Sequence, residues 1–273
     1  MSALAITLWI CGGVTASCWL LSVATREYSW TDRAWSIVPV VYAWVFAARG
    51  GGARAILVAA LITAWGARLT FNFARRGGYA PGGEDYRWGI LRSRLPGWRF
   101  AVFNAVFIAA YQNALLLAIT LPVWTIAEHP RPLRAADAVA AVAFLALLAM
   151  ETVADQQRWN FHRANPGGGV LTTGLNRYSR HPNFFAEIGQ WWVVFAFGAI
   201  AAGTPWLWTG AGAVLLTLLF LGSTAFTEGI SIGRHPEYAD YRRTTSALVP
   251  WPPRRQPATG ARRWLAASGR RRR

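Results

Sequence analysis

The chain has 273 residues, of which 54% are hydrophobic, and it carries a formal net charge of +16. Uncharged stretches of about 20 residues, the length that crosses a bilayer core, alternate with strongly basic segments, and this pattern excludes a soluble globular domain. The positive charge does not require a nucleic-acid partner, because membrane topology and anionic lipid headgroups account for it.

Seven hydrophobic segments follow one another along the chain. The second is short and contains Pro39, which indicates a tilted or re-entrant segment, or one extended toward Asp32, and makes six spans the alternative count. We therefore predict an all-α polytopic membrane bundle of about seven transmembrane helices, in one domain that covers residues 1–252. The predicted spans are residues 3–24, 34–48, 53–74, 100–126, 135–153, 184–203 and 205–226.

The distribution of arginine predicts the orientation of the bundle, and the chain contains no lysine. With seven spans, one side collects most arginines and the tail at 253–273, which we expect to be disordered and to face lipid headgroups. Because arginine-rich loops stay in the cytoplasm, the N-terminus is predicted outside and the C-terminus inside, in the cytoplasmic (inner) membrane of a bacterium. The other side has only Arg49, Arg54, Arg131 and Arg134.

Two cysteines, Cys11 and Cys18, lie two helical turns apart in the first predicted span. At that spacing they cannot form a disulfide with each other, and without histidine or cysteine partners nearby they make no metal site. We therefore predict no metal centre.

Polar residues at the end of the fifth span form the first candidate cluster. Glu151, Asp155, Arg158 and His162 are spaced by four, three and four residues, which places them on one face of a helix. Intramembrane charges are costly and are kept where they have a partner or a function. The stripe is therefore either a set of helix salt bridges or one wall of a polar ligand site.

The second cluster begins just before the sixth span. Pro182 suits the first turn of a helix, on which Asn183 and Glu187 then share a face. Arg180 and His181 precede that helix, and we expect them to offer cationic partners to Glu187. The alternative is a capped helix start with a structural ion pair.

The third cluster follows the seventh span, where residues 234–243 are rich in arginine and tyrosine. This composition suits an interfacial amphipathic helix. Glu228 stands at the membrane end of an otherwise apolar helix, so its carboxylate needs a hydroxyl, an amide or a cation.

Five motifs occur in order along nearly the whole chain except the tail. With these motifs the chain resembles the DUF1295 branch of the steroid 5-alpha-reductase-like superfamily. The histidine-proline element is shared with isoprenylcysteine and phospholipid methyltransferases, whereas the ordered set is much more specific. The motifs are Asp32-x-x-Trp35, Glu84-Asp-x-Arg-Trp88, Glu151-x-x-x-Asp-x-Gln157, Arg180-His-Pro-Asn-x-x-x-Glu187, and Pro236-Glu-Tyr-Ala-Asp-Tyr241 with Val249-Pro-Trp251.

The resemblance implies a seven-helix membrane enzyme that takes NADPH from the cytoplasmic side and delivers hydride to the β carbon of an enone in a steroid-like or other lipid substrate. Arginines would pair with the cofactor phosphates, and amide or acidic groups with the carboxamide and ribose hydroxyls. No Gly-x-Gly-x-x-Gly fingerprint is present, and the run at 167–169 is interpreted as a loop hinge. The positions so implied are Asp155, Arg158, His162, Arg180, His181, Asn183, Glu187, Glu228 and Tyr241.

The chain departs from steroid reductases at the group that polarises the substrate ketone, because their tyrosine is absent. The equivalent neighbourhood offers Trp65, Arg68 and Asn72 on one helix, and Asp32 at the start of another. We take Asp32 and Arg68 as candidate catalytic residues, with Arg68 polarising a carbonyl. The structural alternative is an ion pair between these two residues.

Two other functions stay open on the sequence alone. One is an S-adenosylmethionine-dependent methyltransferase of the isoprenylcysteine or phospholipid type, although Ala186 and the single Glu228 depart from the pattern of those enzymes. The other is a lipid-binding membrane protein without catalysis.

Overall fold

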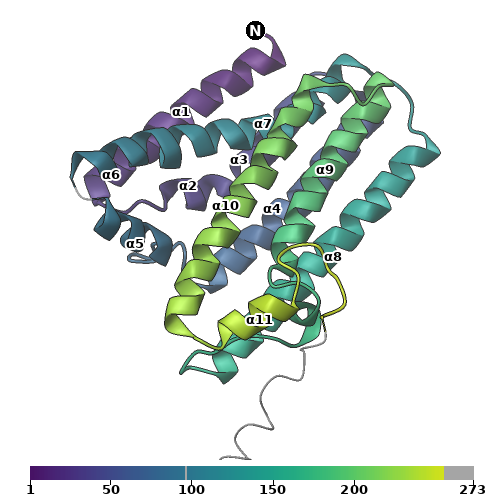
Figure 1. The fold of residues 1–273 in the computed structure, drawn as a ribbon. Helices are drawn as coiled ribbons and strands as arrows, with labels where there is room; N and C mark the ends of the chain where they lie inside the picture. Colours follow the sequence, from purple (N-terminus) through teal and green to yellow (C-terminus); the bar gives the residue numbers. More distant parts are fainter. Residues whose placement is uncertain (96, 255–273) are drawn as a thin grey trace, which may run out of the picture. The chain divides into compact units, whose positions relative to one another are not determined.

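The structure is a computed structural model that describes residues 1–95 and 97–254, so most of the predicted tail at 253–273 lies outside the described residues. All regular elements of the described ranges are helical, and only an isolated bridge joins Ser179 and Ser246. The α-helices are α1 (Ala3–Thr25), α2 (Trp30–Trp35), α3 (Val38–Ala47), α4 (Gly52–Arg75), α5 (Tyr86–Arg94), α6 (Trp98–Phe103), α7 (Gln112–Glu128), α8 (Ala135–Ala164), α9 (Pro182–Ala202), α10 (Ala211–Arg234) and α11 (Tyr238–Thr244), shown in Figure 1.

Three further helical elements complete the set in the described residues. Two are 3₁₀ turns, η2 (Gly174–Arg177) and η3 (Trp208–Gly210), and the third is a π-helix, η1 (Asn104–Tyr111), which joins α6 to α7 without a break.

Six helical runs of the described chain are long and apolar enough to cross a membrane. They confirm the predicted all-α polytopic membrane bundle and make this an integral membrane protein. The runs are Ala3–Thr25, Gly52–Arg75, Trp98–Glu128, Ala135–Ala164, Pro182–Ala202 and Trp208–Arg234.

The short second segment does not form a span of its own, in line with the alternative count of six. The chain forms two short helices there, α2 and α3, and the ten residues of α3 are about half of what a bilayer core requires. Pro39 lies in the first turn of α3, where its missing N–H costs no helical hydrogen bond. The helix packs against α4 and α7, and Tyr42, Ala43 and Phe46 are fully buried.

Two predicted spans end later than the hydrophobic pattern indicated. α8 continues to Ala164 rather than Val153, and α10 continues to Arg234 rather than Phe226. The added turns carry Asp155 and Glu228, so both carboxylates lie on regular helix. The apolar pattern alone stops where these polar residues begin, which is why it placed the ends too early.

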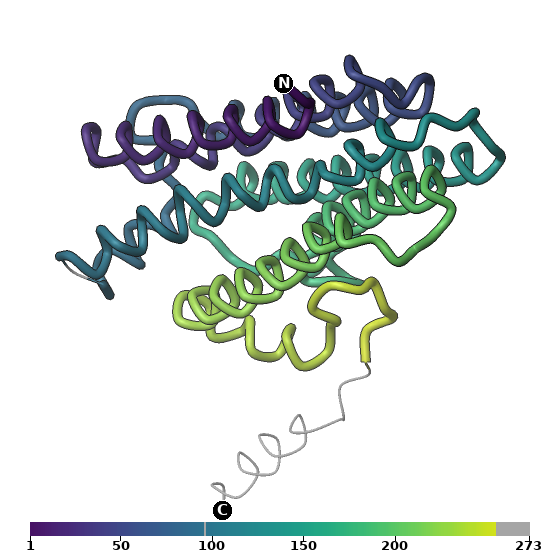
Figure 2. The backbone as a smooth tube through the Cα atoms, turned by 90° about the horizontal axis from the view of Figure 1, so that it is seen from above, coloured from purple at the N-terminus to yellow at the C-terminus, as the bar shows by residue number. Residues whose placement is uncertain are grey.

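The chain divides into two compact units, each described by itself below. Unit 1 comprises Met1–Thr152 and Ala186–Gly222, and unit 2 comprises Val153–Phe185 and the chain from Ser223. The helices α8, α9 and α10 each contribute residues to both units, as the tube in Figure 2 allows the reader to follow.

Unit 1 contains a sealed ion pair, formed by Arg54 in the first turn of α4 and Asp137 in the first turn of α8. Both side chains are almost fully buried, and the guanidinium donates to both carboxylate oxygens at 2.6 and 2.8 Å. It also donates to the carbonyl of Pro132 at 2.9 Å, and the N–H of Arg134 donates to Asp137 at 2.7 Å. The pair thereby ties the start of α4 to the start of α8.

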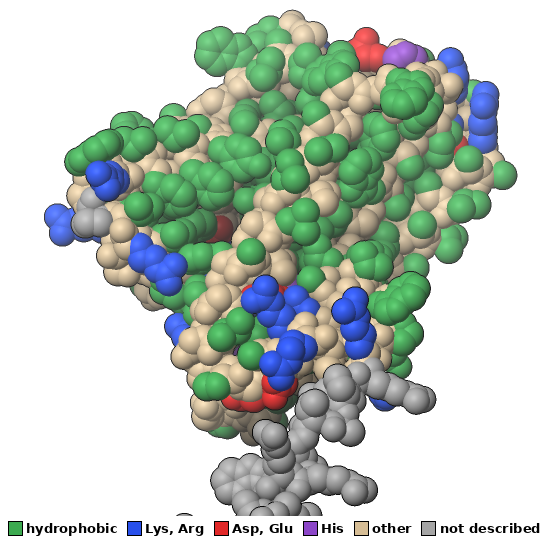
Figure 3. Space-filling view, in the orientation of Figure 1, with side chains coloured by type: hydrophobic (Ala, Val, Ile, Leu, Met, Phe, Trp, Pro, Cys, Tyr) green, Lys and Arg blue, Asp and Glu red, His purple; other side chains and the backbone are tan. Residues whose placement is uncertain are grey.

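The helices of unit 1 leave large apolar side chains on their outward faces. Figure 3 shows hydrophobic side chains over much of the visible surface. In a soluble protein such a continuous apolar surface would drive association, whereas lipid tails cover it at no cost. Exposed examples are Leu8, Trp9 and Leu20 on α1 and Val139, Val142 and Leu145 on α8.

Candidate functional site

The loop that carries Arg180 and His181 is held by backbone hydrogen bonds within unit 2. The N–H of Arg180 donates to the carbonyl of Ser246 at 2.8 Å, and that of His181 to Ala247 at 3.1 Å. Asn176 in η2 donates from its amide to the carbonyl of Arg180 at 3.2 Å. These bonds fix two side chains directly before Pro182, where α9 begins.

Glu228 on α10 accepts from the side chains of Arg180 and His181 in this loop. Arg180 donates to its two oxygens at 2.6 and 3.0 Å, and the Nε2 atom of His181 lies 3.1 Å from one of them. Arg242 on α11 lies 3.5 Å from the other oxygen. The prediction that Glu228 needs a polar partner is confirmed.

The prediction that Arg180 and His181 would pair with Glu187 is wrong. Both side chains pair instead with Glu228 on α10, 47 to 48 positions away in the sequence. The sequence places Glu187 one turn from the loop, but the folded chain brings Glu228 to it.

Burial favours the neutral form of His181, and its hydrogen bond to Glu228 selects the tautomer of that form. Because a carboxylate only accepts, Nε2 must carry the proton that it donates to Glu228. Burial lowers the pKa of His181, and the charges of Arg158 and Arg180 lower it further, while Glu228 acts in the opposite direction. Its Nδ1 atom is buried and has no hydrogen-bond partner among the described residues, so it is available as an acceptor.

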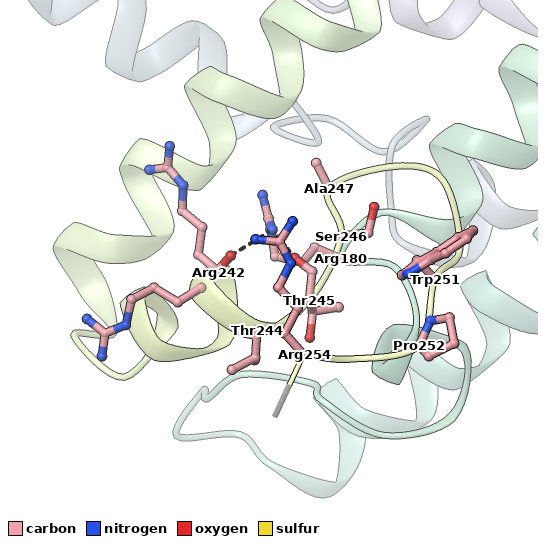
Figure 4. Close-up of a pocket in the computed structure, with 10 residues that line it drawn as sticks. Arg180, Arg242, Thr244, Thr245, Ser246, Ala247, Trp251, Pro252 and Arg254 are labelled. Carbon is pink, nitrogen blue, oxygen red and sulfur yellow. Dashed lines mark hydrogen bonds between the residues drawn. The ribbon is translucent and has the colours of Figure 1, made fainter. Parts of the chain in front are cut away.

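A pocket of about 510 Å³ opens beside this cluster in unit 2. Figure 4 shows Arg180 and Arg242 together with the chain from Thr244 to Ala247 and the ring of Trp251 around it. Arg243 and Arg254 also line the pocket. Four arginines outnumber the two carboxylates that pair with them, Glu228 and Asp240, so the pocket keeps excess positive charge.

Tyr241 lines a second pocket of unit 2, of about 550 Å³, with Arg177, Glu237 and Asp240. Its hydroxyl donates to the carbonyl of Asn176 at 2.5 Å, and burial raises the pKa of Tyr241 to about 12. A phenol whose proton is committed to a backbone carbonyl positions η2 rather than serving as an acid at neutral pH.

The end of α8 carries the predicted polar stripe. Asp155 is buried, Arg158 is half-buried and His162 is exposed. Gln157, from the same motif, accepts from the N–H of Leu175 at 2.9 Å and so holds η2. The stripe is thus helical as predicted, with only its first part shielded from solvent.

Asn183 lies in the first turn of α9, in unit 2. Its side-chain oxygen is buried and has no hydrogen-bond partner within the described chain. A buried amide oxygen without a partner is unfavourable unless a ligand or water donates to it.

In unit 1, Arg68 on α4 forms an ion pair with Glu151 on α8. Gln190 on α9 donates to the other oxygen of Glu151 at 2.7 Å. All three side chains are largely or fully buried in helices that can span a membrane. Sequence reasoning singled out Arg68 and Glu151 but missed Gln190, although an amide in the middle of an apolar span is the signal that would have found it.

Asp32 is not part of that group, so the alternative of an ion pair between Asp32 and Arg68 is wrong. The carboxylate of Asp32 accepts from the indole N–H of Trp88 at 2.7 Å, and burial raises its pKa. Ser29, beside it, accepts from the N–H of Asp85 at 2.9 Å. Two of the recognised motifs therefore meet here and join the loop at 84–88 to α2.

The remaining predictions concern loops and metal ligands. The glycine run at 167–169 is a loop, as predicted, with φ of 88° at Gly168 and 128° at Gly169. Cys11 and Cys18 are free thiols. Within the described residues no three His, Cys, Asp or Glu side chains gather as a metal site.

All candidate site residues lie in the part of the chain that matches a known protein family. Residues 18–245 match the family described as "Protein of unknown function (DUF1295)", a range that includes every candidate from Asp32 to Tyr241. The chain is 34% identical over 258 residues to "Uncharacterized protein C594.04c" of the fission yeast Schizosaccharomyces pombe; the match covers 85% of this chain and 75% of the yeast protein. No solved structure matches the chain.

Proposed function

Since the chain belongs to the DUF1295 family, we propose that it is an NADPH-dependent membrane reductase that acts on the carbon–carbon double bond of a lipid enone. The observation that carries the proposal is the arginine-lined pocket of unit 2, which lies beside the buried carboxylate of Glu228 and holds excess positive charge. A dinucleotide carries several phosphate charges, and guanidinium groups bind phosphate in a bidentate manner.

The charge of the pocket favours this cofactor over S-adenosylmethionine. That molecule has no phosphate and carries a sulfonium cation, which an excess of arginine would repel. Arg242 and Arg243 are the residues that would hold phosphates, and Arg180 would add a further donor beside them. When bound, the nicotinamide would supply the hydride.

The residues of this chain have separate roles in the proposal. Glu228 orients Arg180 and His181, and the buried oxygen of Asn183 and the Nδ1 atom of His181 offer acceptors to carboxamide or ribose donors. Arg68, held by Glu151 in unit 1, is the candidate that polarises the substrate carbonyl.

The remaining cofactor candidates are assigned by motif. The family resemblance alone assigns Asp155, Arg158, His162, Glu187 and Tyr241 to the cofactor, with Tyr241 acting through η2. We also propose that the protein lies in the cytoplasmic membrane of a bacterium with the arginine-rich loops in the cytoplasm.

Binding of three nucleotides to the full-length protein in detergent micelles tests the proposal. Isothermal titration with NADPH, NADH and S-adenosylmethionine should show saturable binding of NADPH, weaker binding of NADH and none of S-adenosylmethionine. Arg242→Gln should weaken NADPH binding about tenfold, the effect of one charge-assisted hydrogen bond. Arg242 is suited to this test because its side chain is 55% exposed and its substitution leaves the buried cluster in place.

Arg163→Gln is the matched control, because Arg163 is an exposed arginine of unit 2 that does not line the pocket. Unchanged NADPH affinity in Arg242→Gln would contradict the assignment of the pocket. Binding of S-adenosylmethionine instead of NADPH would indicate a methyltransferase, and binding of neither would indicate a lipid-binding protein.

A further inference from the structure

A second polar group lies inside unit 1, among three helices that can span a membrane. Trp65 and Arg68 lie on one face of α4, and Trp191 follows Gln190 on α9. The rings of Trp65 and Trp191 pack edge to face, with centroids 4.9 Å apart. Glu151 of α8 joins the same helices by accepting from Arg68 and Gln190.

Both indole N–H groups of this pair lack an acceptor among the residues that the structure describes. Trp65 is 1% exposed and Trp191 2% exposed, and neither Nε1 atom has a hydrogen-bond partner in the described part of the chain. Burying such a donor removes its bond to water without replacing it. An edge-to-face pair lets one N–H donate to the face of the other ring, but this arrangement is not reciprocal, so at least one donor remains.

Other tryptophans of the same unit do not share this feature. The indole N–H of Trp88 donates to Asp32 at 2.7 Å, that of Trp44 to Thr63 at 2.9 Å, and that of Trp192 to Thr217 at 3.1 Å. Trp192 directly follows Trp191 in α9. The pair Trp65 and Trp191 therefore differs from these three tryptophans, including the direct neighbour of Trp191.

The chemistry of the group selects one kind of ligand atom. An indole N–H only donates, so its partner must be an acceptor. Arg68 already has Glu151 as its counter-charge, which makes an anionic ligand less suitable than a neutral one. The surrounding residues lie in apolar helices that can span a membrane, so a ligand at this group would be hydrophobic.

We propose that Trp65 and Trp191 together bind the carbonyl oxygen of a hydrophobic ketone through their indole N–H groups. The inference rests on the proposed function and deepens it, because it names the groups that hold the oxygen of the enone. Donors at this oxygen also stabilise negative charge that develops on it. It assigns to two tryptophans the position for which the sequence offers no tyrosine.

The test uses the indole N–H signals of the full-length protein in detergent micelles. Protein labelled with ¹⁵N-tryptophan is titrated, without NADPH, with a 4-en-3-one steroid and with a long-chain 2-enone. Each ketone is compared with its deoxy analogue, in which the carbonyl is replaced by CH₂. The signals of Trp65 and Trp191, identified with Trp65→Phe and Trp191→Phe, should move downfield with at least one ketone and stay in place with its analogue.

The two phenylalanine variants should also bind that ketone about five- to tenfold more weakly, while affinity for the deoxy analogue stays the same. Trp192→Phe is the matched control, since its N–H already donates to Thr217 and its loss should leave both affinities unchanged. If a variant does not fold, the wild-type spectra still test the inference. The number of indole signals that move with the ketone, but not with its deoxy analogue, shows whether two indole N–H groups respond to the carbonyl.

The inference is overturned if no ketone moves these signals or if the deoxy analogues move them equally. NADPH titrated into the same samples separates this result from failure of the proposed function. NADPH binding without a ketone-dependent shift contradicts the tryptophan pair alone. A ketone-dependent shift without NADPH binding supports the pair and contradicts the reductase.

Discussion

Two buried arginine–carboxylate pairs of this protein have nearly the same geometry but different surroundings. Arg54 and Asp137 in unit 1 are joined by two short hydrogen bonds, as are Arg180 and Glu228 in unit 2. Each arginine also donates to backbone carbonyls, Arg54 to Pro132 and Arg180 to Arg242 and Thr245.

The difference lies in what surrounds each pair. The pair of Arg54 is sealed, with a fully buried guanidinium and a carboxylate that also accepts from a backbone N–H. The pair of Arg180 lies at a pocket, and its carboxylate also accepts from His181, whose second ring nitrogen lacks a partner in the described residues. A purely structural ion pair and one at a candidate site are therefore both buried and both hydrogen-bonded. They differ in whether polar atoms without a partner lie beside the pair.

The largest effect is expected at the sealed pair. Asp137→Asn leaves the Arg54 guanidinium buried without a counter-charge, which should cost about 3–5 kcal/mol of unfolding free energy. The midpoint of thermal unfolding in detergent measures this loss. The double variant Arg54→Met with Asp137→Leu should recover most of it, because an apolar pair of similar volume needs no compensation. A stable Asp137→Asn protein would show that the pair is not sealed.

Glu228→Gln should have a smaller effect, about 2 kcal/mol, because Arg180 keeps its backbone acceptors and lies beside an open pocket. The same variant removes negative charge from a pocket proposed to bind phosphates. The rise in unfolding temperature that saturating NADPH produces should therefore be larger in Glu228→Gln than in the wild type, and unchanged in Asp137→Asn. Equal increments in all three proteins would contradict the distinction between an open and a sealed pair.

The smallest expected effect is a pH dependence that His181 gives to the open pair. Because burial lowers the pKa of His181 below its ordinary value of 6.5, the unfolded chain binds a proton more readily than the folded chain. This contribution to stability is complete above about pH 6.5 and is lost as the pH falls below it, with Glu228 acting against the effect and Arg158 and Arg180 reinforcing it.

Thermal unfolding between pH 7.5 and 5.5 measures this dependence. His181→Gln should flatten it, since an amide can still donate to Glu228 but does not titrate. His129→Gln, at an exposed histidine, serves as the control and should keep the wild-type slope. An equal slope in the wild type and in His181→Gln would show that His181 does not cause the pH dependence of stability.

Much of the fold could be predicted from local patterns, because the apolar runs follow directly from the thickness of a bilayer. The need of Glu228 for a polar partner could be predicted in the same way. Which cation meets it could not, because Arg180 is 48 residues away and reaches it only through the backbone bonds to Ser246 and Ala247. From sequence spacing alone, Glu187 is an equally suitable partner for Arg180.

For a related reason, the sequence did not show whether the second apolar segment crosses the membrane. Its composition is apolar enough for a membrane helix, but α3 has only ten residues and packs one face against α4 and α7, and Gly66 on α4 allows the approach. A Cβ atom at Gly66 would lie 2.6 Å from a methyl group of Val40. Similarly, residue type and spacing could not predict that the indole N–H groups of Trp65 and Trp191 lack acceptors among the described residues, because this depends on which side chains pack around them.

The π-helix η1 changes which side chains share a face before and after it in the longest membrane run, Trp98–Glu128. Asn104 and Asn113 are nine residues apart, about two and a half turns of a regular α-helix, so a uniform helix would direct them to opposite sides. Both are buried, and Asn104 donates to Ser22 on α1 at 2.8 Å. The wider turns of η1 rotate α7 relative to α6, so a helical wheel drawn through Trp98–Glu128 is out of phase after Tyr111.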